Sequence, residues 1–296
     1  MTREKAQSAA SPAATFIGLA AILLWSALAL LTASAGAIPP FELAALTFAV
    51  GGGLGLGYAA LRGRLAALVQ PWRVWAVGIG GLFGYHALYF AALNRAPPAE
   101  ASLIAYLWPL LIVLFSALLP GERLEARHVV GAALGFAGAA TLFAGKAGGF
   151  SFAAVDPRVL SGDALALGCA FVWSSYSVLS RRLKAAPTEA VAGFCVATAA
   201  LAALCHFAFE ANVAPAGPLQ WAAITGLGLG PVGLAFYVWD HGVKHGDIRL
   251  LGVAAYAAPV LSTLILVAAG FAPATLTLGL ACALIVAGAV VATRRG

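Results

Sequence analysis

A histidine and a group of tyrosines and tryptophans are the side chains of this sequence best suited to recognising a ligand. Tyr85 and Tyr89 are four residues apart, so a helix would place them on one face with His86 beside them. A buried Tyr hydroxyl or Trp N–H needs a hydrogen-bond partner. Several such groups therefore favour a cavity with apolar walls and polar rims; ordinary helix packing is the alternative. The candidate substrate-binding residues are Tyr85, His86, Tyr89, Tyr106, Trp108, Trp173, Tyr256 and Trp25.

Ionisable residues are scarce inside the apolar runs of the chain. His86 lies near the centre of one, where it could line a pathway, transfer a proton or be a neutral core histidine; we favour pathway lining. Glu42, Glu100, Asp163 and Glu189 lie at the starts of their runs, where the helix dipole stabilises carboxylates, so capping is their expected role. No buried carboxylate would then serve a sodium or proton cycle, which predicts transport without tight ion coupling.

No other residues form a convincing catalytic or metal site. The four cysteines lie in apolar runs without a CxxC pair, so we expect neither a disulfide nor zinc. Asp240, His241, His245 and Asp247 resemble a metal-binding set, but Lys244 lies among them and a solvated loop between two spans is the favoured interpretation. The chain also has no GxSxG motif and no paired acids within a span. We therefore predict no cofactor, no metal and no enzymatic activity.

Gly228, Gly230 and Gly233 form a G-x-G-x-x-G string that could suggest dinucleotide binding. That function requires a preceding strand and a following helix in a βαβ unit. Here the glycines lie inside an apolar run that contains Pro231. Small residues that let transmembrane helices approach closely explain the string better.

Composition indicates what must position these residues. Hydrophobic residues make up 62% of the 296 residues and charged residues 9%, with a mean hydropathy of +0.95. A soluble domain has about 25% charged residues, so this chain is solvated by lipid. A soluble enzyme, a nucleic-acid-binding protein and a disordered chain are excluded. The basic residues behind the net charge of +6 separate apolar runs rather than forming a stripe, so no nucleic-acid partner is predicted.

Ten apolar runs are long enough to cross a membrane as helices. A spanning helix needs about 20 mostly apolar residues, and no run shows the alternation of a membrane β-strand. The first run follows Arg3 and Lys5 but is longer than the apolar region of a signal peptide, so we expect it to be retained. The sequence predicts an all-α integral membrane protein with ten transmembrane helices at 14–34, 41–61, 74–93, 99–119, 129–145, 160–180, 189–209, 219–239, 250–270 and 274–293.

The distribution of Lys and Arg predicts the orientation of these spans. With the N-terminus in the cytoplasm, only Arg95, Lys146 and Arg158 lie outside, which leaves fourteen of the 17 Lys and Arg residues inside. Because cytoplasmic loops carry the excess of Lys and Arg, both termini are predicted to be cytoplasmic.

The chain also repeats itself at an offset of about 150 residues; Trp25, for example, corresponds to Trp173. Each half has five predicted helices, so the second half would enter the membrane from the opposite side. Inverted repeats are common in transporters with a site near the midplane, although channels and some enzymes have them too. The two repeats are expected at 1–146 and 147–296, together forming one membrane domain.

Two prolines occupy equivalent positions in the middle of their spans. Pro109 and Pro259 each remove a helical hydrogen bond and free the carbonyl four residues earlier, at Ala105 and Ala255. In lipid a freed carbonyl must find protein, water or ligand. We expect helix kinks at both prolines, which either line a polar cavity or only shape the packing.

The chain resembles the drug/metabolite transporter superfamily in its EamA-type ten-helix branch, and within it the YddG-type aromatic amino-acid exporters. The resemblance covers nearly the whole chain. It implies a carrier of the bacterial inner membrane that works by alternating access, with the two halves rocking about a central site. The motifs that carry it are Pro109, Gly121-Glu122-Arg123-Leu124, Gly131 and Gly138, together with Gly162-Asp163 and WSSYSVLSRR at 173–182.

We therefore expect a multi-pass carrier that exports neutral, mainly aromatic amino acids, with an amino acid and the lipid bilayer as its partners. The ten-helix unit is complete in itself, so a monomer would suffice. The first alternative is a carrier for another small amphipathic metabolite or drug, with or without proton coupling. Two further alternatives are an intramembrane enzyme that uses His86 and a passive channel.

Overall fold

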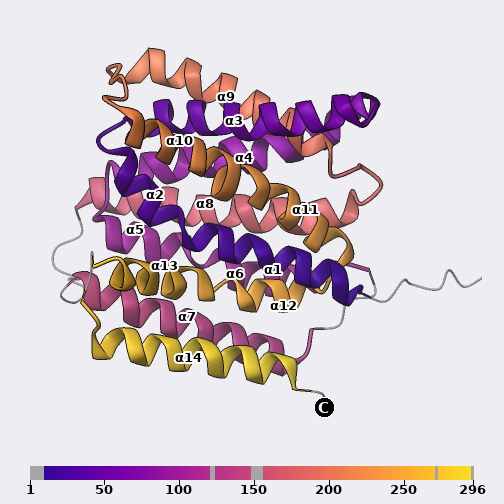
Figure 1. Cartoon of the computed structure of the whole chain (residues 1–296). Coiled ribbons are helices and arrows are strands. Elements are labelled where there is room, and N and C mark those ends of the chain that lie inside the picture. The colour runs from indigo at the N-terminus through magenta and orange to yellow at the C-terminus, as the bar shows by residue number, and fades with distance from the viewer. Residues whose placement is uncertain (1–9, 121–123, 148–155, 271–272, 295–296) are drawn as a thin grey trace, which may run out of the picture.

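The computed structural model is a bundle of helices that run side by side and describes residues 10–120, 124–147, 156–270 and 273–294 (Figure 1). Within those ranges nine helical spans are long and apolar enough to cross a membrane, and a shorter apolar one covers Glu100–Ser116. The predicted all-α membrane fold is thus confirmed. The elements are α1 (Pro12–Ser26), α2 (Leu28–Ala35), α3 (Pro40–Leu61), η1 (Leu65–Leu68), α4 (Trp72–Leu93), α5 (Pro98–Ala105), α6 (Trp108–Ser116), α7 (Ala126–Ala147), α8 (Pro157–Arg182), α9 (Ala190–Phe209), α10 (Pro218–Leu229), η2 (Gly230–Leu234), α11 (Ala235–His245), α12 (Ile248–Ala254), α13 (Ala257–Ala268) and α14 (Leu276–Thr293).

The packing of the helices follows a twofold pattern. The second helix of each half, α3 and α9, pack together along their lengths, and so do the last helices, α7 and α14. The pair α4 and α8 has its counterpart in α11 and α1, with the roles of the two halves exchanged. This reciprocal packing is what two inverted five-helix repeats require.

Both ends of the described chain lie at the same end of the bundle, on the right in Figure 1. The backbone N–H of Ser11 donates to the carbonyl of His245 at 2.9 Å, and Arg127 donates to the carbonyl of Arg294. We call this the inner end, because it carries most of the Lys and Arg. Arg95 and Arg158 lie at the opposite, outer end.

Four of the predicted spans are interrupted: 14–34 at Ala27, 219–239 by η2, and two others at equivalent places in the two halves. Span 99–119 divides into α5 and α6 at Tyr106 and Leu107, and span 250–270 divides into α12 and α13 at Ala255 and Tyr256. Each of these two breaks lies just before the equivalent proline, which is at the start of the second segment. Proline is tolerated in the first turn of a helix, because the N–H that it lacks would have no helical partner there. The breaks therefore recur at the same place in both halves.

The span predicted at 219–239 is longer in the structure and corrects an expectation from the sequence. Asp240 and Lys244 lie in α11 and are only 1% and 5% exposed, so they are not in a solvated loop. Asp240 Oδ2 and Lys244 Nζ are 2.8 Å apart; Thr188 Oγ1 donates to the same Oδ2, and Nζ donates to the Ala186 carbonyl. A buried carboxylate is thus present, stabilised by a cation one helical turn away.

The glycine string at 228–233 packs helices closely, as predicted. A Cβ added to Gly51 of α3 would lie 2.7 Å from the Cα of Gly233 and 3.0 Å from the carbonyl oxygen of Gly228. Because these distances leave no room for a side chain, glycines on both sides allow the backbones of α3 and η2 to touch.

Candidate substrate site

A cavity of about 110 Å³ lies near the middle of the bundle. Six of the eight predicted binding residues line it, while Tyr89 and Tyr256 do not. Five further lining residues were not predicted, because four of them are aliphatic or proline residues without a polar signal, and Phe236 was not distinguished from other aromatic residues. The lining residues are Trp25, Leu28, Tyr85, His86, Tyr106, Trp108, Trp173, Pro231, Val232, Phe236 and Ala258.

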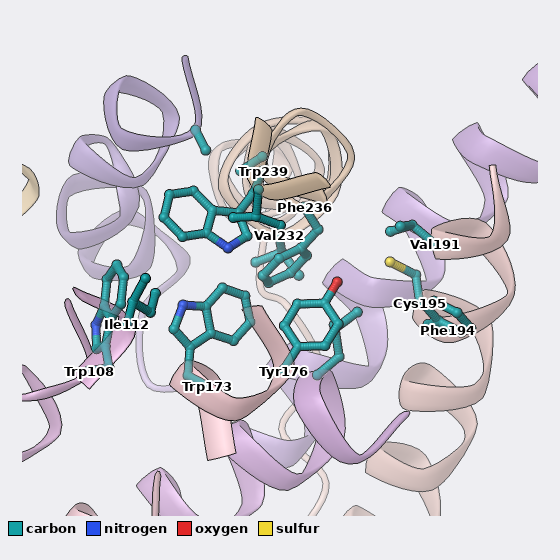
Figure 2. Packing of buried hydrophobic residues seen from close by; sticks show 14 of the residues in the cluster. Trp108, Ile112, Trp173, Tyr176, Val191, Phe194, Cys195, Val232, Phe236 and Trp239 are labelled. Atoms are coloured by element: carbon teal, nitrogen blue, oxygen red, sulfur yellow. The ribbon is translucent and has the colours of Figure 1, made fainter. Parts of the chain in front are cut away.

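Three tryptophans from different helices form one wall of the cavity. The ring of Trp25 lies 6.1 Å from that of Trp108 and 5.9 Å from that of Trp173, both edge-to-face. Figure 2 shows Trp108, Trp173 and Phe236 gathered with the fully buried Trp239 between the same helices. Edge-to-face contacts stabilise such clusters, so the wall is held in place by its own packing and offers ring faces and edges to a ligand.

The hydrogen bonding of His86 fixes which of its nitrogens faces a ligand. His86 Nδ1 is 2.7 Å from the carbonyl oxygen of Leu82. A carbonyl only accepts, so we assign the proton to Nδ1. In the neutral ring Nε2 is then an acceptor, and the rings of Phe48, Tyr85 and Phe90 surround it without offering an anion. His86 is thus suited to bind a cation or an N–H donor, not a carboxylate.

Three residues that line the same cavity carry hydrogen-bond donors. In the described part of the chain, the indole N–H groups of Trp108 and Trp173 and the hydroxyl of Tyr106 have no hydrogen-bond partner, although all three residues line the cavity. Trp25 differs, because its Nε1 donates to the Pro231 carbonyl at 3.1 Å. Three donors are therefore available for an anionic group of a ligand.

Tyr89 and Tyr256 have internal partners instead. The Tyr89 hydroxyl is 2.8 Å from Ser102 Oγ, and its ring stacks with that of Tyr85 at 6.0 Å. Tyr256 is fully buried, and its hydroxyl accepts the backbone N–H of Leu110 at 3.1 Å. That N–H belongs to the first turn of α6, which has no helical acceptor for it. Tyr256 therefore caps the broken helix of the other half.

The side of the cavity toward the inner end is closed by a second set of contacts. Trp239 Nε1 donates to Ser177 Oγ at 3.1 Å, and Arg181 donates to the carbonyls of Val243 and Gly246 at 3.1 and 2.7 Å. These bonds join α8 to α11 and the turn after it, and the buried Asp240–Lys244 pair of α11 bonds to Thr188 and Ala186 between α8 and α9. The cavity is therefore separated from the inner end by packed and hydrogen-bonded side chains.

Comparison with known proteins identifies the family to which this architecture belongs. The model of the EamA-like transporter family matches residues 12–144 and again residues 160–294. A protein of Ancylobacter novellus named aromatic amino acid exporter YddG is 62% identical over 281 residues, covering 95% of this chain and 96% of that protein. A Salmonella typhimurium protein of the same name is 28% identical over 269 residues, covering 86% and 87%.

A solved crystal structure matches with a TM-score of 0.91 and 61% sequence identity, covering 95% of this chain and 96% of the other. These matches confirm the resemblance that the sequence motifs indicated, although Gly121 to Arg123 of the most specific motif lie outside the described residues. The nine membrane-length spans found in the described ranges are those of a multi-pass membrane protein. The chain belongs to the EamA-like transporter family.

Proposed function

We propose that this protein exports neutral, mainly aromatic amino acids across the bacterial inner membrane by alternating access. The observation that carries the proposal is the central cavity, which combines a tryptophan wall with one acceptor and three donors. The names of the two relatives, aromatic amino acid exporters, support the same substrate class.

The ammonium group of the substrate would bind at His86. Its Nε2 is the free acceptor, and the neighbouring ring of Tyr85, 5.3 Å away, offers a π-face to the positive charge. A cation over an aromatic ring gains about 0.5–2 kcal/mol. We therefore propose that His86 accepts a hydrogen bond from the substrate ammonium and does not donate one to the substrate carboxylate.

The carboxylate of the substrate would accept hydrogen bonds from Trp108, Trp173 and Tyr106. Hydrogen bonds to charged groups contribute about 1.5–3 kcal/mol each, roughly twice the neutral value. The aromatic side chain would then pack among the remaining rings of the wall. Opposite charges of one amino acid thus find different partners within a single cavity.

The size of the cavity favours an amino acid over the alternative of a drug. Sites for drug-sized ligands are about 300–1,000 Å³, whereas this cavity is about 110 Å³. A larger ligand would require the tryptophan wall to move apart. An amino acid requires far less displacement.

The two repeats, 1–146 and 147–296, would rock about the cavity, with both termini in the cytoplasm as the basic inner end indicates. We propose facilitated transport, in which the substrate gradient drives export. Among the buried carboxylates, Asp240 is engaged by Lys244 and Thr188 and Glu42 accepts the backbone N–H of Val213, which supports structural roles rather than an ion cycle.

The test is uptake of labelled phenylalanine by liposomes that contain the purified protein, with and without a pH gradient. We expect saturable uptake that tryptophan inhibits and the gradient does not change. Phenethylamine, which lacks the carboxylate, and phenylpropionate, which lacks the ammonium, should both compete poorly. Uptake no greater than in empty liposomes would refute the substrate class, non-saturable flux would indicate a channel, and chemical turnover of a substrate in detergent would indicate an enzyme.

A further inference from the structure

A groove at the outer end of the bundle has no role in the proposed transport site. It has a volume of about 480 Å³ and lies between the ends of α3, α4, α8 and α9. The first two helices belong to the first half of the chain and the last two to the second half. The lining residues are Phe41, Ala91, Asn94, Arg95, Arg158 and Phe209.

Two arginines line this groove. Arg95 donates to the carbonyl of Ala91 at 3.1 Å and Arg158 to the carbonyl of Asn94 at 3.0 Å, so both are held at the end of α4. Within the described residues neither forms an ion pair with a carboxylate, and both are exposed. Each guanidinium has five donors in a rigid fork, so several remain for a ligand.

The nearby carboxylates accept hydrogen bonds from backbone N–H groups or from a histidine. The Glu210 carboxylate accepts the N–H groups of Phe41 and Glu42 at 2.9 and 3.1 Å and bonds to His206 at 3.0 Å. Asp156 accepts the N–H of Arg158 at 2.8 Å. None of the described residues that line the groove is acidic, so the ammonium of a zwitterion would have no carboxylate partner in the groove itself. The groove is complementary to an anion without a neighbouring cation.

Two of the remaining lining residues of the groove are aromatic. Phe41 is the second residue of α3, and Phe209 is the last residue of α9 and is 78% exposed. All lining residues lie at or near helix ends on one side of the bundle, where the phosphates of a bilayer also lie. An amphiphile with an anionic head and apolar chains therefore fits the groove better than a free ion.

We infer that this groove binds the phosphate of an anionic glycerophospholipid from the outer leaflet, with its acyl chains along Phe41 and Phe209. Arginine binds phosphate through paired hydrogen bonds, and two arginines from different halves would donate hydrogen bonds to one headgroup. Because the groove lies where the halves meet, the bound lipid bridges the two units that rock during transport. This inference requires only the predicted orientation, not the substrate proposed above.

The test is retention of phosphatidylglycerol against phosphatidylcholine by the delipidated full-length protein in mixed micelles, measured by native mass spectrometry. We expect the unchanged protein to retain one phosphatidylglycerol preferentially. The variant R95Q/R158Q should lose affinity for it by at least about tenfold. R95K/R158K, which keeps the charge but not the fork, should lose less.

The matched control is R62Q/R73Q, which removes two exposed arginines that lie over Tyr58 and Trp72 at the inner end. It should keep the preference within about twofold, because its arginines are outside the groove. Size-exclusion profiles and thermal unfolding verify that each variant is folded. Equal retention by R95Q/R158Q and the unchanged protein would overturn the inference. So would displacement of the lipid by phenylalanine, which indicates a substrate site, or by excess inorganic phosphate, which indicates a free-anion site.

Discussion

The two spans that break before Pro109 and Pro259 use equivalent tyrosines in opposite ways. Tyr106 at the α5–α6 break lines the central cavity with its hydroxyl unpaired among the described residues, whereas Tyr256 at the α12–α13 break is fully buried. The Tyr256 hydroxyl accepts the N–H of Leu110 and so stabilises the start of α6. One break thus presents a group to the ligand, and the other supports the first.

This difference shows that a repeat in sequence does not imply a repeat in function. A symmetric site would require Tyr106 to cap α13 as Tyr256 caps α6, and then no tyrosine hydroxyl from either break would be available to a ligand. The asymmetry releases one donor while keeping the other helix start satisfied. We expect substitutions at the two breaks to separate transport from stability.

The largest effect on transport should come from the tryptophan next to the first break. Trp108→Ala removes an aromatic wall and an N–H donor, so we expect kcat/KM for phenylalanine uptake to fall by about a hundredfold or more. Trp221→Ala, which changes a 48% exposed tryptophan at a span end, is the control and should retain uptake. Uptake by Trp108→Ala within about twofold of the unchanged protein would contradict the proposal that residues at the first break bind the substrate.

A large effect on stability is expected in the second half of the chain, which contains Tyr256 and the buried Asp240. Asp240→Asn leaves the buried Lys244 without its counter-ion, which typically costs about 3–5 kcal/mol. Unfolding in a graded detergent series would measure this loss. The double variant D240N/K244M should recover most of it, since no unpaired charge remains. No loss in the single variant would show that the pair is not buried in the membrane-embedded protein.

Tyr106→Phe sharpens the comparison at its centre. The loss of one hydrogen bond to the substrate carboxylate should raise the KM for phenylalanine by about tenfold. The midpoint of thermal unfolding should not change, because the hydroxyl has no partner among the described residues. A lowered midpoint with an unaltered KM would reverse the roles assigned to the two tyrosines.

The smallest effect on transport is expected at Tyr256, the residue equivalent to Tyr106. Tyr256→Phe leaves the Leu110 N–H without an acceptor, which should lower the free energy of unfolding by about 1–2 kcal/mol. The KM should remain within about twofold, since the hydroxyl faces α6 and not the cavity. Thermal unfolding and uptake of the same preparation test both statements together.

Much of the fold follows from the sequence because apolar length decides it. The expected span 41–61 corresponds to α3 at Pro40–Leu61, and 189–209 to α9 at Ala190–Phe209. The span at 219–239 was wrong at one end, because Asp240 was taken as the boundary with water. The spacing of Asp240 and Lys244, one helical turn, was the available signal that the helix continued as a paired segment.

The site was predictable only in part. Residue type identifies Trp108 and His86 as candidates, and both line the cavity. The rotation of a helix about its axis depends on partners distant in sequence, so Tyr256 could not be separated from Tyr106 by its position in the repeat. The tautomer of His86 likewise depends on one carbonyl, that of Leu82, which helical geometry places within reach but does not select.

The bond between Trp25 and Pro231 has a consequence for how the protein is made. The two residues are 206 positions apart, and a ribosome adds about 5–20 residues per second. About 10–40 seconds therefore pass between the synthesis of Trp25 and that of Pro231, whose carbonyl accepts the indole N–H. Until then the N-terminal half lacks contacts that it needs, so the two halves mature together and not as independent units.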